Sequence, residues 1–178
     1  AALTKQTFGD NVEIKLFKYP KELEKEIIKN PPDIIGFSHY GWNSNLSLLF
    51  INMVKRLNPN VITVMGGPNI RNEKKDLKTF LKTNPNLDYY ILFDGEKPFV
   101  DLVHNLLNNK TEAPDGCAAL REGNLIYNPI TLINQEIDLP SPYLTGWLDK
   151  FLKDPNMIPL IETNRGCPFG CAYCTWGS

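Results

Sequence analysis

The sequence is poor in features that would place the protein at a membrane or on nucleic acid. No apolar run among its 178 residues is long enough to cross a bilayer, and the polar residues after Ala1 lead us to expect no signal peptide there. Neither charge sign dominates, since 19 basic and 20 acidic residues give a net charge of -1 without a basic stripe. We therefore expect neither nucleic acid nor a membrane surface as a partner, and we expect a cytoplasmic location.

Cysteine is also scarce, and the four cysteines are not spread along the chain as in a disulfide framework. Three of them form the pattern C-x3-C-x2-C: Cys167, Cys171 and Cys174. Three thiolates on one tight loop can hold three irons of a 4Fe–4S cluster and leave the fourth iron open. Zinc is the competing interpretation, but a structural zinc site needs four ligands, and the other candidates (Cys117, His39 and His104) are distant in sequence.

Apolar segments alternate with amphipathic ones through the first two thirds of the chain. A helix is expected over 3–8, with Gly9 ending it. Strands are expected at four places, with helices between them: 12–17, 33–38, 61–68 and 88–93. The first of these alternates apolar and charged residues, as a half-exposed edge strand does. Alternation of strand and helix predicts an α/β fold, in which a parallel sheet carries helices on both faces.

The pattern changes after Lys110. The stretch GCAALREGNLIYNP predicts a two-stranded hairpin that turns at Glu122 and Gly123, and LTGWLDKFL predicts a short helix within a linker. The run IPLIET predicts one more strand, which leads into the cysteines. We therefore expect three parts: a first domain over 1–112, a hairpin and linker over 113–157, and the start of a further domain over 158–178.

Small and polar residues follow three successive predicted strands. Ligands of open parallel sheets bind outside the carboxyl ends of the strands, where glycine lets them approach the backbone. The candidate binding residues are Ser38, Tyr40, Trp42, Asn43, Gly66, Gly67, Pro68, Gly95 and Glu96. Ordinary turn chemistry is the alternative explanation of each group taken alone, because glycines commonly follow strands.

The stretch ETNRGCPFGCAYC resembles the signature loop of the radical S-adenosylmethionine enzymes. The resemblance implies that the three cysteines hold a 4Fe–4S cluster, whose open iron is chelated by the amino and carboxylate groups of S-adenosylmethionine. One electron from the cluster then cleaves this cofactor to a 5′-deoxyadenosyl radical, and Tyr173 lies near the adenine. It also implies an external electron donor such as flavodoxin or ferredoxin.

The residues before that loop resemble the cobalamin-binding domain that precedes the barrel in many of these enzymes. The resemblance covers about residues 10–178, through PDIIGFS, GGP, DGE and LPSPYLTG. It implies a Rossmann-like, flavodoxin-like domain in which Ser38, Gly66 and Gly67 line the pocket for the nucleotide tail of cobalamin. Gly95 and Glu96 would close the rim. A bulky side chain at Gly67 is then expected to fill the space for that tail.

The chain departs from other cobalamin domains in one respect. It has no Asp-x-His-x-x-Gly motif, whose histidine ligates cobalt from below. We therefore interpret His39 as a pocket-wall or surface residue and expect cobalamin to be bound without a histidine ligand. The first strand of the family's fold would precede residue 3, and its later cofactor motifs would follow Ser178.

The resemblance implies a cobalamin-dependent radical S-adenosylmethionine enzyme, and a methyltransferase in particular, of which this chain alone is expected to be inactive. Two alternatives stay open: a radical enzyme with a degenerate or non-methylating cobalamin domain, and a non-catalytic module that binds cobalamin or metal. Cobalamin absorbance separates the first two hypotheses, and cleavage of S-adenosylmethionine separates both from the third.

Overall fold

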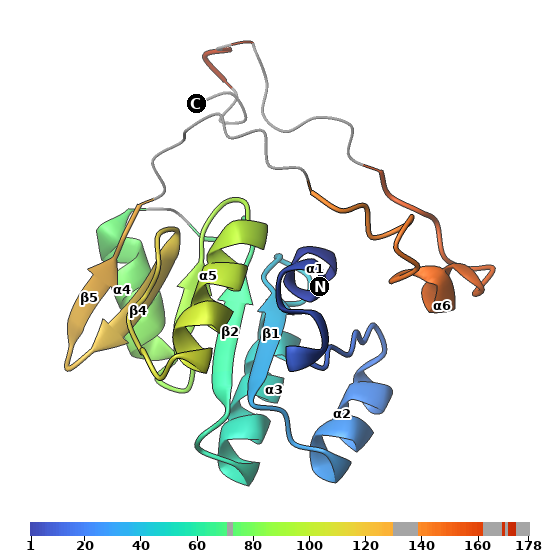
Figure 1. Ribbon diagram of the computed structural model, residues 1–178. Coiled ribbons are helices and arrows are strands. Elements are labelled where there is room, and N and C mark those ends of the chain that lie inside the picture. The colour runs from blue at the N-terminus through green and yellow to red at the C-terminus, as the bar shows by residue number, and fades with distance from the viewer. Residues whose placement is uncertain (71–72, 130–138, 162–168, 170, 174–178) are drawn as a thin grey trace. The chain divides into compact units, whose positions relative to one another are not determined.

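The structure is a computed structural model that describes residues 1–70, 73–129, 139–161, 169 and 171–173 (Figure 1). The chain divides into two compact units, Ala1–Pro140 and Ser141–Ser178. Each unit is described below by itself.

The first unit is built on a five-stranded sheet with the order β1-β2-β3-β4-β5. The strands are β1 (Ile34–Ser38), β2 (Ile62–Gly66), β3 (Tyr89–Ile91), β4 (Cys117–Arg121) and β5 (Asn124–Tyr127). The first three strands pair in parallel, as their continuous apolar runs predicted. The last two pair antiparallel, so the sheet is mixed.

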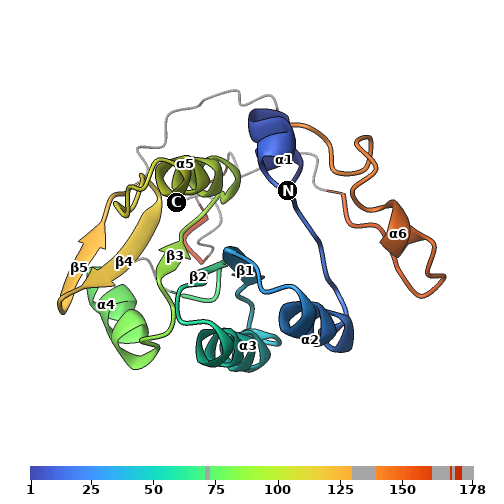
Figure 2. The same ribbon diagram turned by 60° about the horizontal axis from the view of Figure 1, so that its bottom comes forward.

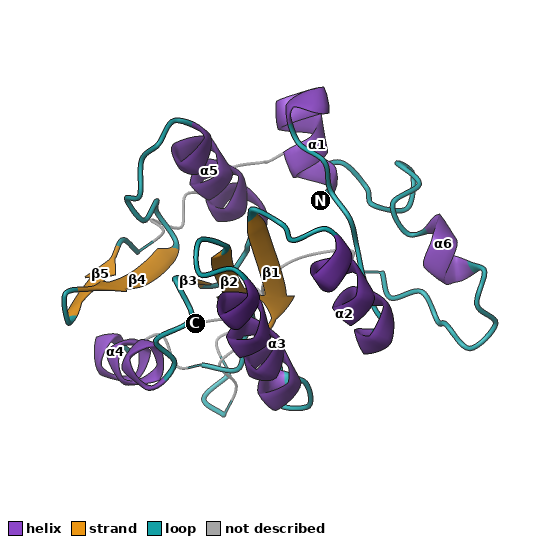
Figure 3. Cartoon of the chain, turned by 90° about the horizontal axis from the view of Figure 1, so that it is seen from below, coloured by secondary structure: helices purple, strands orange, loops and turns teal. Residues whose placement is uncertain are grey.

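Helices cover both faces of this sheet (Figure 2 and Figure 3). On one face lie α2 (Pro20–Lys29), α3 (Ser44–Leu57) and α4 (Lys74–Thr83); on the other lie α5 (Glu96–Leu107) and, beside it, α1 (Ala2–Phe8). A 3-10 turn (Gly9–Asn11) follows α1, and Gly9 takes a φ of 55° where that helix ends, as predicted. The prediction of an α/β, Rossmann-like fold is confirmed.

Two apolar layers hold the helices to the sheet. Ile51 of α3 and Leu77 of α4 pack with Met65 and Tyr90 on one face, and all four are at most 1% exposed. Leu102 of α5 packs with Tyr89 on the other face. The alternation of the two tyrosines between the layers follows from the period of two in a strand. This packing fixes the positions at which the strands end.

The hairpin turns where the sequence predicted. Glu122 and Gly123 have φ values of 51° and 77°, and two positive φ values are what a tight two-residue hairpin turn of the primed type requires. The hairpin was predicted within the 113–157 segment. In the structure β4 pairs with β3, so the hairpin extends the sheet of the first unit.

Two predicted strands are not formed. Residues 12–18 and residues 158–161 carry no strand in the described structure, and 162–163 lie outside the described residues. Alternating or apolar residues favour extended backbone, but a strand also needs a regular ladder of hydrogen bonds with a neighbouring strand, and the sequence pattern does not specify that neighbour. In the second unit the predicted short helix is present as α6 (Asp149–Leu152). No helix in the described ranges has the length and apolar character that spanning a membrane requires.

Candidate functional site

The carboxyl ends of the parallel strands meet at one edge of the sheet (Figure 1). Ser38 of β1 lies opposite Gly66 of β2, and Gly66 lies opposite Ile91 of β3. The predicted glycine-bearing loops therefore leave the sheet side by side. This confirms that Ser38 and Gly67 belong to the same edge, which we call the carboxyl edge.

Side-chain hydrogen bonds close the loop that follows β1. Asn43 Nδ2 donates to Ser38 Oγ at 2.8 Å, and the backbone N–H of Tyr40 donates to Asn43 Oδ1 at 2.8 Å. Ser47, in the first turn of α3, donates from Oγ to the Ser38 carbonyl at 3.2 Å. The loop is thus a turn with fixed geometry, and the exposed Ser38 hydroxyl is held at the end of the strand.

The same loop presents an aromatic pair to the solvent. The rings of Tyr40 and Trp42 stack with a centroid distance of 4.7 Å and an interplanar angle of 7°. Trp42 is 83% exposed and Tyr40 is 37% exposed. A stacked pair with this exposure offers a flat apolar surface that a ligand can cover.

Gly66 and Gly67 are required by the fold itself. A Cβ on Gly66 would lie 3.1 Å from the Ile91 carbonyl oxygen, and a Cβ on Gly67 would lie 2.5 Å from the His39 carbonyl oxygen. Gly67 also has a φ of 142°, which side chains rarely tolerate. A bulky residue at Gly67 was expected to fill the space for the nucleotide tail, but it would first have to separate the two loops. Pro68 follows and is exposed.

The loop after β3 contains a strained residue that sequence reasoning missed. Phe93 has a φ of 57° although it is not glycine, and its side chain is 57% exposed. Gly95 is the N-cap of α5 and Glu96 begins that helix. Gly95 has an ordinary φ of -89°, and a Cβ there would meet Ile91 Cγ2 at 3.7 Å, an ordinary contact. The fold therefore does not require glycine at position 95.

A partly buried polar group connects the loops after β1 and β2. We call it the histidine cluster: His39, Ser44, Asn69 and Tyr90. His39 is 1% exposed, so it belongs to the interior and not to the surface. Its Nδ1 lies 2.8 Å from Tyr90 Oη, and its Nε2 lies 2.9 Å from Ser44 Oγ and 3.1 Å from Asn69 Nδ2. The ring stacks on Phe80 at a centroid distance of 5.0 Å.

The partners of Tyr90 decide which nitrogen of His39 carries the proton. Tyr90 donates its hydroxyl proton to the Gly67 carbonyl at 2.8 Å, and a carbonyl can only accept. Tyr90 Oη must then accept from His39, so Nδ1 bears the hydrogen and Nε2 keeps its lone pair. Asn69 and Ser44 donate to that lone pair. Burial lowers the pKa of His39, so the ring is held neutral.

Only part of the predicted metal site lies within the described residues. Cys171 is exposed and Tyr173 is 92% exposed, whereas Cys167 and Cys174 lie outside the described residues. Among the residues that the structure describes, no group of three or more His, Cys, Asp or Glu side chains comes together. The cluster site stays a prediction. Cys117, the fourth cysteine, is buried in β4, where burial raises the pKa of its thiol to about 12.

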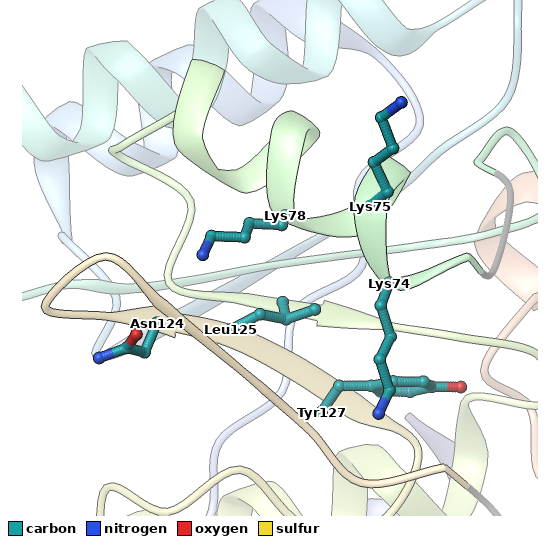
Figure 4. Close-up of a pocket in the computed structure, with 6 residues that line it drawn as sticks. All are labelled: Lys74, Lys75, Lys78, Asn124, Leu125 and Tyr127. Atoms are coloured by element: carbon teal, nitrogen blue, oxygen red, sulfur yellow. The ribbon is translucent and has the colours of Figure 1, made fainter.

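Two described grooves lie away from the predicted binding residues. One, of about 510 Å³, is lined by lysines of α4 and by β5: Lys74, Lys75, Lys78, Asn124, Leu125 and Tyr127 (Figure 4). The other, of about 430 Å³, includes Asp33 and Asn60, which precede β1 and β2. Neither contains a residue predicted to bind a cofactor.

Sequence reasoning found the edge but not the cluster beneath it. Ser44, Asn69 and Tyr90 were not predicted, because their contacts with His39 join residues up to 51 positions apart. One signal was available: Tyr90 lies in a strand covered on both faces, and a buried tyrosine hydroxyl needs a partner.

Comparison with known proteins adds curated relatives. The chain is 32% identical over 158 residues to the 2-(S-pantetheinyl)-carbapenam-3-carboxylate methyltransferase of Streptantibioticus cattleyicolor, covering 83% of this chain and 22% of that protein. It is 32% identical over 155 residues to the cobalamin-dependent radical SAM methyltransferase TokK of Streptomyces tokunonensis, with the same coverage. An uncharacterized methyltransferase of Pyrococcus horikoshii, PH0819, is 27% identical over 157 residues, covering 86% of this chain and 34% of that protein.

A solved structure and a family model agree on the fold. The structure of the cobalamin-dependent S-adenosylmethionine radical enzyme OxsB superimposes with a TM-score of 0.56 at 21% identity, over 72% of this chain and 18% of that one. The chain thus spans about a fifth of the length of the first relatives it matches. The model of the B12 binding domain matches residues 2–103, which include β1, β2, β3 and all three loops of the carboxyl edge. The chain belongs to the B12-binding domain family.

Proposed function

We propose that the chain is the cobalamin-binding part of a cobalamin-dependent radical S-adenosylmethionine methyltransferase. The observation that carries the proposal is the match of the B12-binding family to the segment that forms the carboxyl edge. The two relatives at 32% identity, both methyltransferases, support the reaction class. Because the chain spans 22% of each of them, the substrate contacts are assigned to residues outside it.

The described residues of the carboxyl edge fit cobalamin. Gly41 and Gly95 leave room for a ligand near the backbone, and Ser38 offers a hydroxyl for the nucleotide tail. Tyr40 and Trp42 offer an apolar surface that a large ligand would cover. His39 does not offer a ligand to cobalt, because the lone pair on its Nε2 accepts from Ser44 and Asn69. The cofactor would then be held by loops and not by a histidine–cobalt bond.

The cysteine loop is proposed to hold the second cofactor. Cys167, Cys171 and Cys174 would bind a 4Fe–4S cluster, and Tyr173 would lie near the adenine of S-adenosylmethionine. When bound, cobalamin would supply methyl-transfer chemistry and the cluster would supply one-electron chemistry. An external electron donor such as flavodoxin or ferredoxin would then be the protein partner.

Cobalamin binding by the intact protein tests the first part. We expect stoichiometric binding, followed by absorbance. Gly95→Leu and Gly41→Leu should weaken it, since both positions have ordinary Cβ surroundings and the added side chains would take ligand space. Gly36→Ala, within β1, is the matched control and should bind as the parent does. An intact protein that binds no cobalamin at micromolar concentrations contradicts the proposal.

Iron incorporation tests the second part. Anaerobic reconstitution with iron and sulfide should give a 4Fe–4S cluster in the intact protein, and serine at any of Cys167, Cys171 or Cys174 should abolish it. Cys117→Ala is the control, because Cys117 is buried in the sheet and should leave the iron content unchanged. Equal iron content after all three loop cysteines are replaced would contradict the assignment. Cleavage of S-adenosylmethionine by the reconstituted protein separates an enzyme from a binding module.

A further inference from the structure

The carboxyl edge has few direct bonds between the loops that are expected to hold the ligand. The backbone N–H of His39 donates to the Gly66 carbonyl at 2.7 Å, and the N–H of Asn69 donates to the His39 carbonyl at 3.4 Å, which is long for a hydrogen bond. Among the residues that the structure describes, the further side-chain hydrogen bonds between these loops involve the imidazole of His39. The ring donates to Tyr90, which in turn donates to the Gly67 carbonyl. The ring also contacts Asn69 directly.

These ties hold residues with predicted roles. Tyr40 and Trp42 follow His39 in the chain, and Gly67 and Pro68 precede Asn69. His39 is 1% exposed, and its imidazole has Phe80 of α4 stacked against one face and Tyr90 of β3 edge-on at a centroid distance of 5.6 Å. A ring turned by 180° would fill the same space but would place carbon atoms against Tyr90, Ser44 and Asn69, so the hydrogen bonds select the observed orientation.

We propose that neutral His39 is a positioning residue of the candidate cobalamin site, which fixes the loop after β1 against the loop after β2 through Tyr90 and Asn69. This inference rests on the function proposed above. His39 touches neither cobalt nor substrate in this scheme. It sets the distance between the aromatic pair on one loop and the glycine backbone on the other, so that both meet the same ligand.

Only the neutral ring satisfies the whole histidine cluster as it stands. A second proton on the ring would be bound to Nε2 and would face the N–H group of Asn69 Nδ2. Two donors would then point at each other, so either the imidazole or the Asn69 amide would have to rotate. The groups that face the ring are Ser44 from α3, Phe80 from α4, Asn69 from the loop and Tyr90 from β3. Tyr90 is the titratable one among these four, and burial raises its pKa, so it stays neutral. None of them is a carboxylate that would offset the added charge, so acid is expected to disrupt the arrangement.

Two substitutions separate positioning from simple packing. In asparagine the side-chain amide lies about where Nδ1 of histidine lies, so His39→Asn can still donate to Tyr90. In glutamine the amide lies about where Nε2 lies, so His39→Gln leaves Tyr90 without a donor. His104→Gln is the matched control, because His104 is exposed on α5. Each variant of the intact protein is titrated with cobalamin between pH 5.5 and 8, and amide spectra of the cobalamin-free protein are recorded by nuclear magnetic resonance.

We expect His39→Gln to weaken cobalamin binding about tenfold, which corresponds to one buried hydrogen bond, while His39→Asn binds within about threefold of the parent. The parent should lose affinity on acidification, and both variants should lose that dependence. Equal binding and the same pH profile in the parent and in His39→Gln would overturn the proposal while leaving the cobalamin function intact.

The cobalamin-free spectra test the inference even if the protein binds no cobalamin. The Gly67 amide and the Trp42 indole signals should shift in His39→Gln and stay in place in His104→Gln. Unchanged signals at both positions in His39→Gln would overturn the positioning role. A Tyr90→Phe variant gives a second reading without touching the imidazole, since it removes the same connection to Gly67.

Discussion

The close approach of two backbones at Gly67 makes a sharp prediction about stability. Gly67→Ala adds one methyl group, whose carbon would lie 2.5 Å from the His39 carbonyl oxygen and 3.0 Å from the His39 nitrogen. Both atoms belong to the backbone and cannot rotate away. The substitution therefore has to move the loop after β1, the loop after β2, or both.

The expected cost has two parts. A φ of 142° in a residue with a side chain costs about 1–3 kcal/mol, and forcing an extra methyl group into a filled space costs about as much again. The free energy of unfolding should therefore fall by about 2–6 kcal/mol, a large fraction of the roughly 5–15 kcal/mol of a typical domain. With a urea m-value of about 1–3 kcal/mol/M, the unfolding midpoint should drop by about 1 M or more.

Two glycines provide the controls for this measurement. Gly123 has a φ of 77° but nothing within 4 Å of its Cβ position, so Gly123→Ala should show the conformational cost alone. Gly41→Ala has an ordinary contact, 3.8 Å from Asn69 Oδ1, and should change stability by about 0.5 kcal/mol or less. Urea unfolding followed by circular dichroism gives all three values. A Gly67→Ala protein as stable as Gly41→Ala would refute the argument from backbone contact.

Three further predictions concern titration, reactivity and a partly buried ion pair. Because burial lowers the folded-state pKa of His39, stability should fall as the pH drops below about 6.5, by up to about 1.4 kcal/mol per pH unit; thermal unfolding should show a flatter profile for His39→Asn. Cys117, with its pKa raised to about 12, should react with a thiol reagent at pH 8 only after unfolding, whereas the exposed Cys171 of the metal-free protein should react at once. Asp88→Asn should lower the free energy of unfolding in urea by about 1–3 kcal/mol, because Asp88 contacts Lys55 at 2.7 Å. A double-mutant cycle with Lys55→Met should show coupling between the two side chains, and purely additive effects would contradict a stabilising ion pair.

Local sequence signals predicted most of the fold. Helices bury the apolar runs that form β1, β2 and β3, and the apolar spacing of those helices was visible in the sequence. The strand signal and the helix signal therefore agreed. The hairpin was predictable because Gly123 lies between two apolar runs and glycine readily takes the positive φ that a tight turn requires; Glu122 also has a positive φ, of 51°, although glutamate does not favour it. The strand predicted over residues 12–17 was wrong for a physical reason. The alternation of apolar and charged residues favours extended backbone, but strand formation depends on a neighbouring strand that the pattern does not specify.

The candidate site was predictable only to the level of the sheet edge. Parallel pairing brings strand ends together whatever the side chains are, so Ser38 and Gly66 could be placed from sequence order alone. The histidine cluster could not, since a hydrogen bond between His39 and Tyr90 leaves no periodicity in the sequence. The positive φ of Phe93 likewise has no local signal in the sequence.

Glycines at strand ends have two physical causes, and the structure separates them. Gly66 and Gly67 are small because a neighbouring backbone occupies the place of their side chains. They would be glycines even if no ligand bound, so they are weak support for a pocket. Gly41 and Gly95 have no such neighbour, and neither has a positive φ. Beyond the match to the B12-binding family, the structural support for a cofactor at this edge therefore comes from Gly41, Gly95 and the 83% exposed ring of Trp42, for which the fold of the described residues gives no structural reason.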